Sequence, residues 1–152
     1  MKHMGKVFLL VSTIFLIAGV LVACGNDNPD NEGTFESGGR QYITATQLKE
    51  DIEASVEMFL LDIRIEEQFL DGHLADAVLV PASPVDDDAQ REMVGAVLPQ
   101  VGASPLIIVC AGGGGSANNA WDYLESIDYD MSSVFILENG QNGWPYDELV
   151  VN

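Results

Sequence analysis

Cysteine and histidine are scarce in this chain of 152 residues, which has two of each. Cys24 ends an apolar N-terminal segment and His3 lies at its start, so the rest of the chain contains only Cys110 and His73. A single thiol excludes an intramolecular disulfide in that part. One Cys and one His cannot build a zinc centre, and we expect the protein to use no metal and no cofactor.

Basic residues are also few, with six Lys and Arg against 24 Asp and Glu, for a formal charge of −18. This excess of acid argues against nucleic acid as a partner, and against binding to an anionic membrane surface by charge alone. A basic partner is one interpretation of the acidity. The acidic residues are scattered rather than grouped in blocks, which favours a solvated acidic coat instead.

One long hydrophobic run is present, over residues 7–23. Lys2 and Lys6 precede it, and it ends in Leu21-Val22-Ala23-Cys24, which resembles a bacterial lipobox. A short membrane-spanning anchor is the alternative, because 17 residues lie at the lower edge of the length that spans a bilayer. The small residue before Cys24 and the polar segment after it favour the lipoprotein signal.

The lipobox resemblance implies that residues 1–23 are removed as a signal peptide and that the Cys24 thiol is lipidated. The protein would then be anchored to the cell membrane or outer membrane, facing the periplasm or the cell exterior. Residues 24–40 are polar and acidic, which predicts a flexible linker. Residues 41–152 have the size of one domain, and the processed chain would carry four basic and 24 acidic residues, hence a charge of −20.

Short apolar runs alternate with helical patterns across this domain. The predicted strands are 42–43, 58–63, 77–80, 106–109 and 134–137, and the predicted helices are 44–56, about 66–69, 89–98 and 116–126. This order predicts an α/β fold, with a mainly parallel five-stranded sheet and helices on both faces. Ligands of such sheets bind at the carboxyl ends of the strands.

The strand predicted at 106–109 leads directly into the most informative segment, which consists of Cys110, Ala111, Gly112, Gly113, Gly114, Gly115 and Ser116. Glycines allow successive backbone N–H groups to point inward, and the helix that follows adds the positive end of its dipole. Such a loop favours a thiolate and an anion bound beside it, which makes Cys110 a candidate nucleophile. The alternative is a small apolar Cys that closes a strand.

Two groups of segments resemble the rhodanese-like domain family. The first runs from Leu60-Leu61-Asp62-Ile63-Arg64 through Gly72-His73-Leu74 to Ala77-Val78-Leu79-Val80-Pro81. The second comprises Leu106 to Cys110 with the glycine loop, and Val134-Phe135-Ile136-Leu137-Glu138-Asn139-Gly140 with Trp144-Pro145. Within a buried strand, Asp62 is expected to be a hydrogen-bonded structural group and Arg64 its neighbour or a loop anchor. The resemblance implies that His73 is structural as well. We expect Trp121 in the core and Trp144 near the rim of the loop.

The resemblance also implies a sulfurtransferase. Cys110 would attack thiosulfate or another small anionic donor of sulfane sulfur, keep the sulfur as a persulfide, and pass it to a thiol or to cyanide. Backbone N–H groups of residues 111–116 would hold the anion, and Ser116 could cap the next helix. A rhodanese-fold module that binds a partner or carries sulfur without efficient turnover is the alternative. The oligomeric state stays open.

The loop departs from the family in one respect, because many members carry Arg or Lys where this chain has Gly115. Activation of the thiolate would then rest on the backbone and the helix dipole, and turnover of thiosulfate is expected to be weak. Protein phosphatases and arsenate reductases share the order of thiol, loop and helix. They require an Arg six positions after the Cys, and Ser116 occupies that position here.

Overall fold

The computed structural model describes residues 34–37 and 39–152, with side chains from Gly39 onward. The predicted signal peptide and the lipidation of Cys24 lie outside the described residues and stay predictions. Within the described residues, no helix combines the length and the apolar character needed to span a bilayer.

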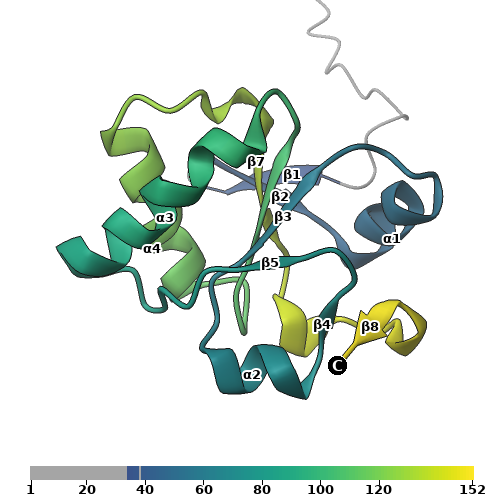
Figure 1. Cartoon of the computed structure of the whole chain (residues 1–152). Helices are drawn as coiled ribbons and strands as arrows, with labels where there is room; N and C mark the ends of the chain where they lie inside the picture. Colours follow the sequence, from purple (N-terminus) through teal and green to yellow (C-terminus); the bar gives the residue numbers. More distant parts are fainter. Residues whose placement is uncertain (1–33, 38) are drawn as a thin grey trace, which may run out of the picture.

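A six-stranded sheet in the order β1-β2-β7-β6-β3-β5 forms the centre of the domain (Figure 1). Its strands are β1 (Thr34–Ser37), β2 (Arg40–Ile43), β3 (Phe59–Asp62), β5 (Val78–Leu79), β6 (Leu106–Val109) and β7 (Val134–Leu137). All neighbours from β2 to β5 pair in parallel, which confirms the five predicted parallel strands. Every residue of β6 is buried, as expected for a central strand covered on both faces.

Four helices surround the sheet, namely α1 (Ala45–Glu53), α2 (Glu66–Asp71), α3 (Asp88–Val101) and α4 (Gly115–Ser126). α3 and α4 pack against each other on one side of the sheet, and α1 lies on the other side (Figure 1). α2 lies at the edge where β3 ends (Figure 1). The predicted helices on both faces are therefore present.

The core divides into two layers because side chains alternate along β6. Leu106 and Ile108 pack in the cluster that contains the buried side chains of α3 and α4. Ile107 and Val109 pack in the second cluster, with the buried residue of α1. Cys110 continues this alternation and belongs to the first cluster, so its thiol faces the α3–α4 side.

Two features of the fold differ from the sequence-based expectation. β1 pairs antiparallel with β2, although it lies within residues 24–40, where composition predicts an irregular linker. A separate two-stranded sheet joins β4 (His73–Leu74) to β8 (Val150–Val151). These strands exist through their backbone pairing with distant segments, so they leave no apolar periodicity in the local sequence.

The ends of two helices were predicted only approximately. Thr44 and Thr46 are both possible caps from the sequence, and Thr44 caps α1, its hydroxyl accepting the Gln47 N–H at 3.1 Å. The helix ends at Glu53, however. Val56, which the four-residue spacing of Leu48, Ile52 and Val56 predicts on one apolar face of the helix, is 47% exposed. α3 begins within a residue of its predicted start and runs on through Pro99 to Val101.

Candidate functional site

The Cys110 thiol lies immediately after β6, at the carboxyl edge of the parallel sheet. The residue is only 4% exposed, and its Sγ accepts a hydrogen bond from the Gly113 N–H at 3.2 Å. The loop thus folds back over its own thiol, as the glycine sequence predicts.

Close backbone packing explains two of the glycines around Cys110. Gly113 has a φ of +68°, and a Cβ placed there would lie 2.6 Å from the Asn139 nitrogen and 2.7 Å from the Leu137 oxygen. Gly140 has a φ of +57°, and its Cβ would lie 2.6 Å from the Gly113 nitrogen. Both positions combine a left-handed backbone with no room for a side chain.

The turn that follows β7 fixes the loop from outside. The Gln141 N–H donates to the Cys110 carbonyl at 2.8 Å, and the Asn142 N–H donates to the Ala111 carbonyl at 2.9 Å. Sequence reasoning missed Gln141 and Asn142 as supports of the site, because they act through their backbones. The only local signal was Asn139-Gly140, which marks a turn after a strand.

The remaining glycines face open space. A Cβ at Gly112, Gly114 or Gly115 would have no heavy atom within 4 Å. Gly114 is the N-cap of α4 and supplies no side-chain hydrogen bond to the helix. The first intrahelical hydrogen bond runs from the Asn118 N–H to the Gly114 carbonyl. The N–H groups at the very start of α4 therefore precede the helix's own bonds and can receive an anion.

Ser116 does not cap α4, contrary to the expectation, because the helix already begins at Gly115. Its hydroxyl instead lies 2.8 Å from the Ser83 hydroxyl, in the segment that leads to α3. The Asn119 side chain makes a parallel contact, its amide donating to the Pro84 carbonyl at 2.9 Å. These bonds tie the first turns of α4 to residues 83–84, a support that the sequence did not reveal.

Asp62 and Arg64 form a buried ion pair, which supports the structural interpretation. Asp62 is 0% exposed and Arg64 is 4% exposed. The guanidinium donates to both carboxylate oxygens, to Oδ1 at 3.0 Å and to Oδ2 at 2.6 Å, and also to the Gly72 carbonyl at 2.9 Å. The pair thus anchors the chain on both sides of α2, and neither group is available for a substrate.

The other singled-out residues also have structural contacts. The His73 ring stacks on Phe69 with centroids 3.6 Å apart, and its Nδ1 lies 2.9 Å from the Phe69 carbonyl. Trp121 is a buried core residue of α4, as predicted. Trp144 is buried on the α1 side, where its indole N–H donates to the Tyr146 carbonyl at 2.9 Å.

Basic side chains are committed elsewhere in the described part of the chain. Arg40 pairs with Asp122, and Lys49 pairs with Glu53 and Glu148. Arg91 lies on α3, 3.5 Å from Asp88. With Arg64 buried in its own pair, the Cys110 loop depends on backbone dipoles for any positive potential.

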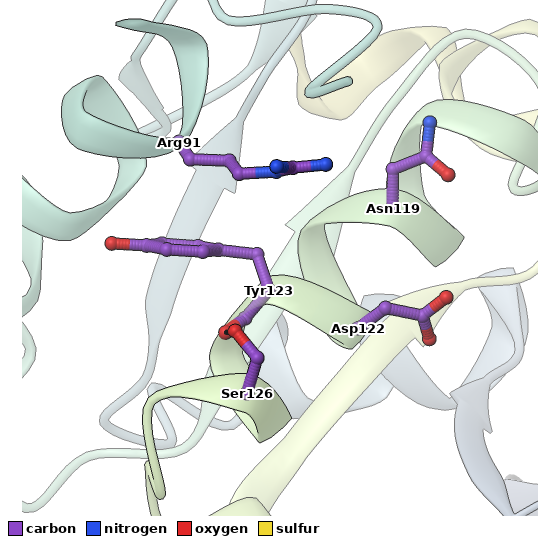
Figure 2. Close-up of a pocket in the computed structure, with 5 residues that line it drawn as sticks. All are labelled: Arg91, Asn119, Asp122, Tyr123 and Ser126. Carbon is purple, nitrogen blue, oxygen red and sulfur yellow. Dashed lines mark hydrogen bonds between the residues drawn. The ribbon is translucent and has the colours of Figure 1, made fainter. Parts of the chain in front are cut away.

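A hollow of about 310 Å³ lies between α3 and α4 (Figure 2). Its lining is polar and consists of Arg91, Asn119, Asp122, Tyr123 and Ser126. Figure 2 shows the Arg91 side chain alongside the Tyr123 ring. The Ser126 hydroxyl donates to the Tyr123 carbonyl at 2.6 Å, and Asp122 is held by Arg40. We assign this hollow to the packing of the two helices, since its lining has no thiol and its Ser126 hydroxyl is bonded to the Tyr123 carbonyl.

Comparison with known proteins adds to this geometry. The family model described as the Rhodanese-like domain matches residues 44–146, about two thirds of the chain. The chain belongs to the rhodanese-like domain family. Among curated proteins, none matches the sequence.

Solved structures agree with the family. A rhodanese-like domain protein from Staphylococcus aureus is 27% identical, with a TM-score of 0.55 over 71% of this chain and 94% of that chain. A rhodanese-related protein from Thermoplasma volcanium is 22% identical, with a TM-score of 0.52 over 72% of this chain and 96% of that chain. An As/Sb reductase from Leishmania major is 15% identical and shares the fold. Its TM-score is 0.52 over 72% of this chain and 83% of that chain.

The rhodanese-like site is therefore one buried thiol, a backbone cradle and the start of a helix. Within residues 34–37 and 39–152, no group of three or more His, Cys, Asp or Glu side chains is placed to hold a metal ion. Cys110 is the one nucleophile that the loop presents, and main-chain amides are the groups that could hold an anion next to it.

Proposed function

We propose that this rhodanese-like domain is a sulfurtransferase that carries sulfane sulfur as a persulfide on Cys110. The observation that supports the proposal most directly is the hydrogen bond from the Gly113 N–H to the Cys110 Sγ, next to the start of α4. A persulfide adds one sulfur to this thiol and moves the negative charge outward. The unbonded N–H groups at the start of α4 are suited to receive that charge.

The reaction needs two displacements and no redox partner. The Cys110 thiolate attacks the outer sulfur of thiosulfate, a Cys110–sulfur bond forms, and the donor's S–S bond breaks to release sulfite. The thiolate of an acceptor, or cyanide, then attacks the outer sulfur of the persulfide. Cys110 leaves as a thiolate, and the acceptor departs as a persulfide or as thiocyanate.

The uncharged loop supports an alternative within the same family. No Lys or Arg occurs among residues 110–116, so capture of a small anionic donor gains nothing from a cationic side chain. The domain would then bind a partner or carry sulfur without efficient turnover of free thiosulfate. A phosphatase or reductase mechanism finds less support, because Ser116 stands where such enzymes need a guanidinium, and its hydroxyl bonds Ser83.

Mass spectrometry of the intact protein after incubation with thiosulfate tests the proposal. We expect one added sulfur on Cys110, removed by a thiol or by cyanide, and no addition in Cys110→Ser. The variant should keep the fold, because Ser is nearly isosteric with Cys. Absence of the adduct with thiosulfate and with an organic persulfide donor, in folded protein, would leave the binding module as the function.

We also propose that the domain acts outside the cytoplasm, anchored by lipid on Cys24. The support is the sequence Leu21-Val22-Ala23-Cys24 after an apolar run. Metabolic labelling with a radioactive fatty acid should mark the protein, and Cys24→Ser should abolish both the label and its membrane association. A labelled or membrane-bound Cys24→Ser protein would contradict this.

A further inference from the structure

The short helix α2 presents an unusual surface, which we call the α2 face and define as Ile65, Glu66, Glu67, Leu70 and Asp71. Ile65 is 45% exposed and Leu70 is 62% exposed, the largest value among the exposed large apolar residues of the described chain. α2 contributes no buried residue to the core. A hollow of about 630 Å³ lies over this surface, lined by residues of the α2 face together with Gln68.

The α2 face lies at the edge of the sheet that carries the Cys110 loop (Figure 1). β3 and β6 are adjacent parallel strands, and the Ile63 N–H donates to the Val109 carbonyl at 2.9 Å, one residue before Cys110. Ile65 follows Ile63 by two residues, and two extended residues span at most about 7 Å. In Figure 1, α2 accordingly lies at the same edge of the sheet as the loop that follows β6. A molecule seated on α2 therefore lies at the edge of the sheet that carries the Cys110 loop.

The charge of the α2 face defines the chemistry of its partner. Three carboxylates flank the two apolar side chains, and the nearby Arg64 is buried in its pair with Asp62. The surface thus combines an apolar centre with an acidic rim, on a chain of formal charge −18. The complementary surface is an apolar side chain flanked by Lys or Arg.

We propose that the α2 face docks a protein acceptor, which inserts an apolar side chain next to Leu70 and places basic residues against Glu66, Glu67 and Asp71. The proposal rests on the sulfurtransferase function and names the class of its acceptor. The acceptor's cysteine thiolate attacks the outer sulfur of the Cys110 persulfide, forms a new S–S bond, and releases the Cys110 thiolate. A protein acceptor also explains how a loop without charged side chains selects its partner, because recognition comes from α2.

Two peptide thiols serve as probes of the full chain. One is acetyl-Cys-Gly-Leu-Lys-Leu-Lys-amide, and the other replaces each Lys by Glu. Single-turnover transfer from the Cys110 persulfide should be about tenfold faster to the cationic peptide at low salt, since charge complementarity raises association rates by that order. The advantage should shrink as salt rises.

Leu70→Gln and Ile127→Gln form a matched pair of variants. Ile127 is 44% exposed, and it lies at the far end of α4, toward the opposite edge of the sheet from Cys110. Leu70→Gln should lower the ratio of the cationic to the anionic transfer rate roughly fivefold, as for an interface anchor. Ile127→Gln should leave the ratio unchanged. Equal rates for the two peptides, or equal effects of the two variants, would overturn the proposal.

A binding measurement separates this inference from the sulfurtransferase proposal. Fluorescent versions of both peptides with Ser in place of Cys cannot accept sulfur, yet the cationic one should bind the wild-type chain more tightly than Leu70→Gln. This outcome without a Cys110 persulfide would keep the docking surface and reject the transfer reaction. Self-association of the chain that Leu70→Gln abolishes would instead assign the α2 face to a second copy and overturn a protein acceptor.

Discussion

Gly112 and Gly113 are neighbours in the sequence, yet the structure gives them different roles. Gly113 has a positive φ and packs against the backbone after β7, whereas a Cβ at Gly112 would meet nothing within 4 Å. The same division applies along the loop, since Gly114 and Gly115 also face open space. Packing thus requires Gly113, while the other three glycines leave room for side chains that this protein does not use.

Gly113→Ala is predicted to destabilise the site. The substitution imposes a strained φ and a contact with the Asn139 nitrogen, and should lower the free energy of unfolding by about 2 kcal/mol or more. Gly112→Ala is the matched control and should change it by less than about 1 kcal/mol. Denaturant unfolding measures both. Equal stabilities of the two variants would show that the loop relaxes without cost.

At the scale of elements, α4 and the loop before it form one unit beside the Cys110 thiol. The helix begins without a side-chain cap, and Ser116 and Asn119 tie its first turns to residues 83–84. The turn after β7 holds the other side through Gln141 and the Cys110 carbonyl. The unit is therefore fixed from both sides, and what it lacks is a charged side chain.

Gly115→Arg should supply that charge. A side chain at this position enters open space at the first residue of α4, where replacing Gly also favours the helix. Formation of the Cys110 persulfide from thiosulfate should accelerate about tenfold, by attraction between guanidinium and donor. Gly115→Gln controls for size and should show no such gain, as measured by single-turnover mass spectrometry. An equal gain in both variants would assign the effect to helix stability.

For the molecule as a whole, the net charge opposes the approach of the proposed anionic donor. The chain carries a formal charge of −18, and each of its four basic side chains in the described residues is within reach of a carboxylate. Long-range repulsion should slow the approach of thiosulfate, while a cationic protein acceptor would be attracted. The proposed donor and the proposed cationic acceptor would therefore experience opposite forces in the same field.

Salt is predicted to affect the two half-reactions in opposite directions. Raising ionic strength from about 0.05 M to about 0.5 M shortens the screening length and should speed persulfide formation from thiosulfate severalfold. The same change should slow transfer to the cationic peptide thiol. Rapid-quench kinetics of each step separates the two effects. A rate with thiosulfate that falls as salt rises would contradict the electrostatic account.

The sequence by itself determined the five parallel strands, the main helices and Cys110 at the end of a central strand. These follow from local signals, namely apolar runs, a Thr cap and consecutive glycines before a helix. It also marked Asp62 and Arg64 as structural, because a charged pair in an apolar run must be satisfied internally.

Only the tertiary structure decided which backbone atoms bond to the Cys110 loop and how exposed the α2 face is. Gln141, Ser83 and β1 act through pairing with segments distant in the sequence, and such pairing leaves no local pattern. The rhodanese-like resemblance suggests a capping role for Ser116, whereas its hydroxyl contacts Ser83 instead. The exposure of Leu70 likewise depends on how α2 lies on the sheet edge. Local sequence signals identify Cys110 as the nucleophile, and long-range packing determines which segments surround its loop.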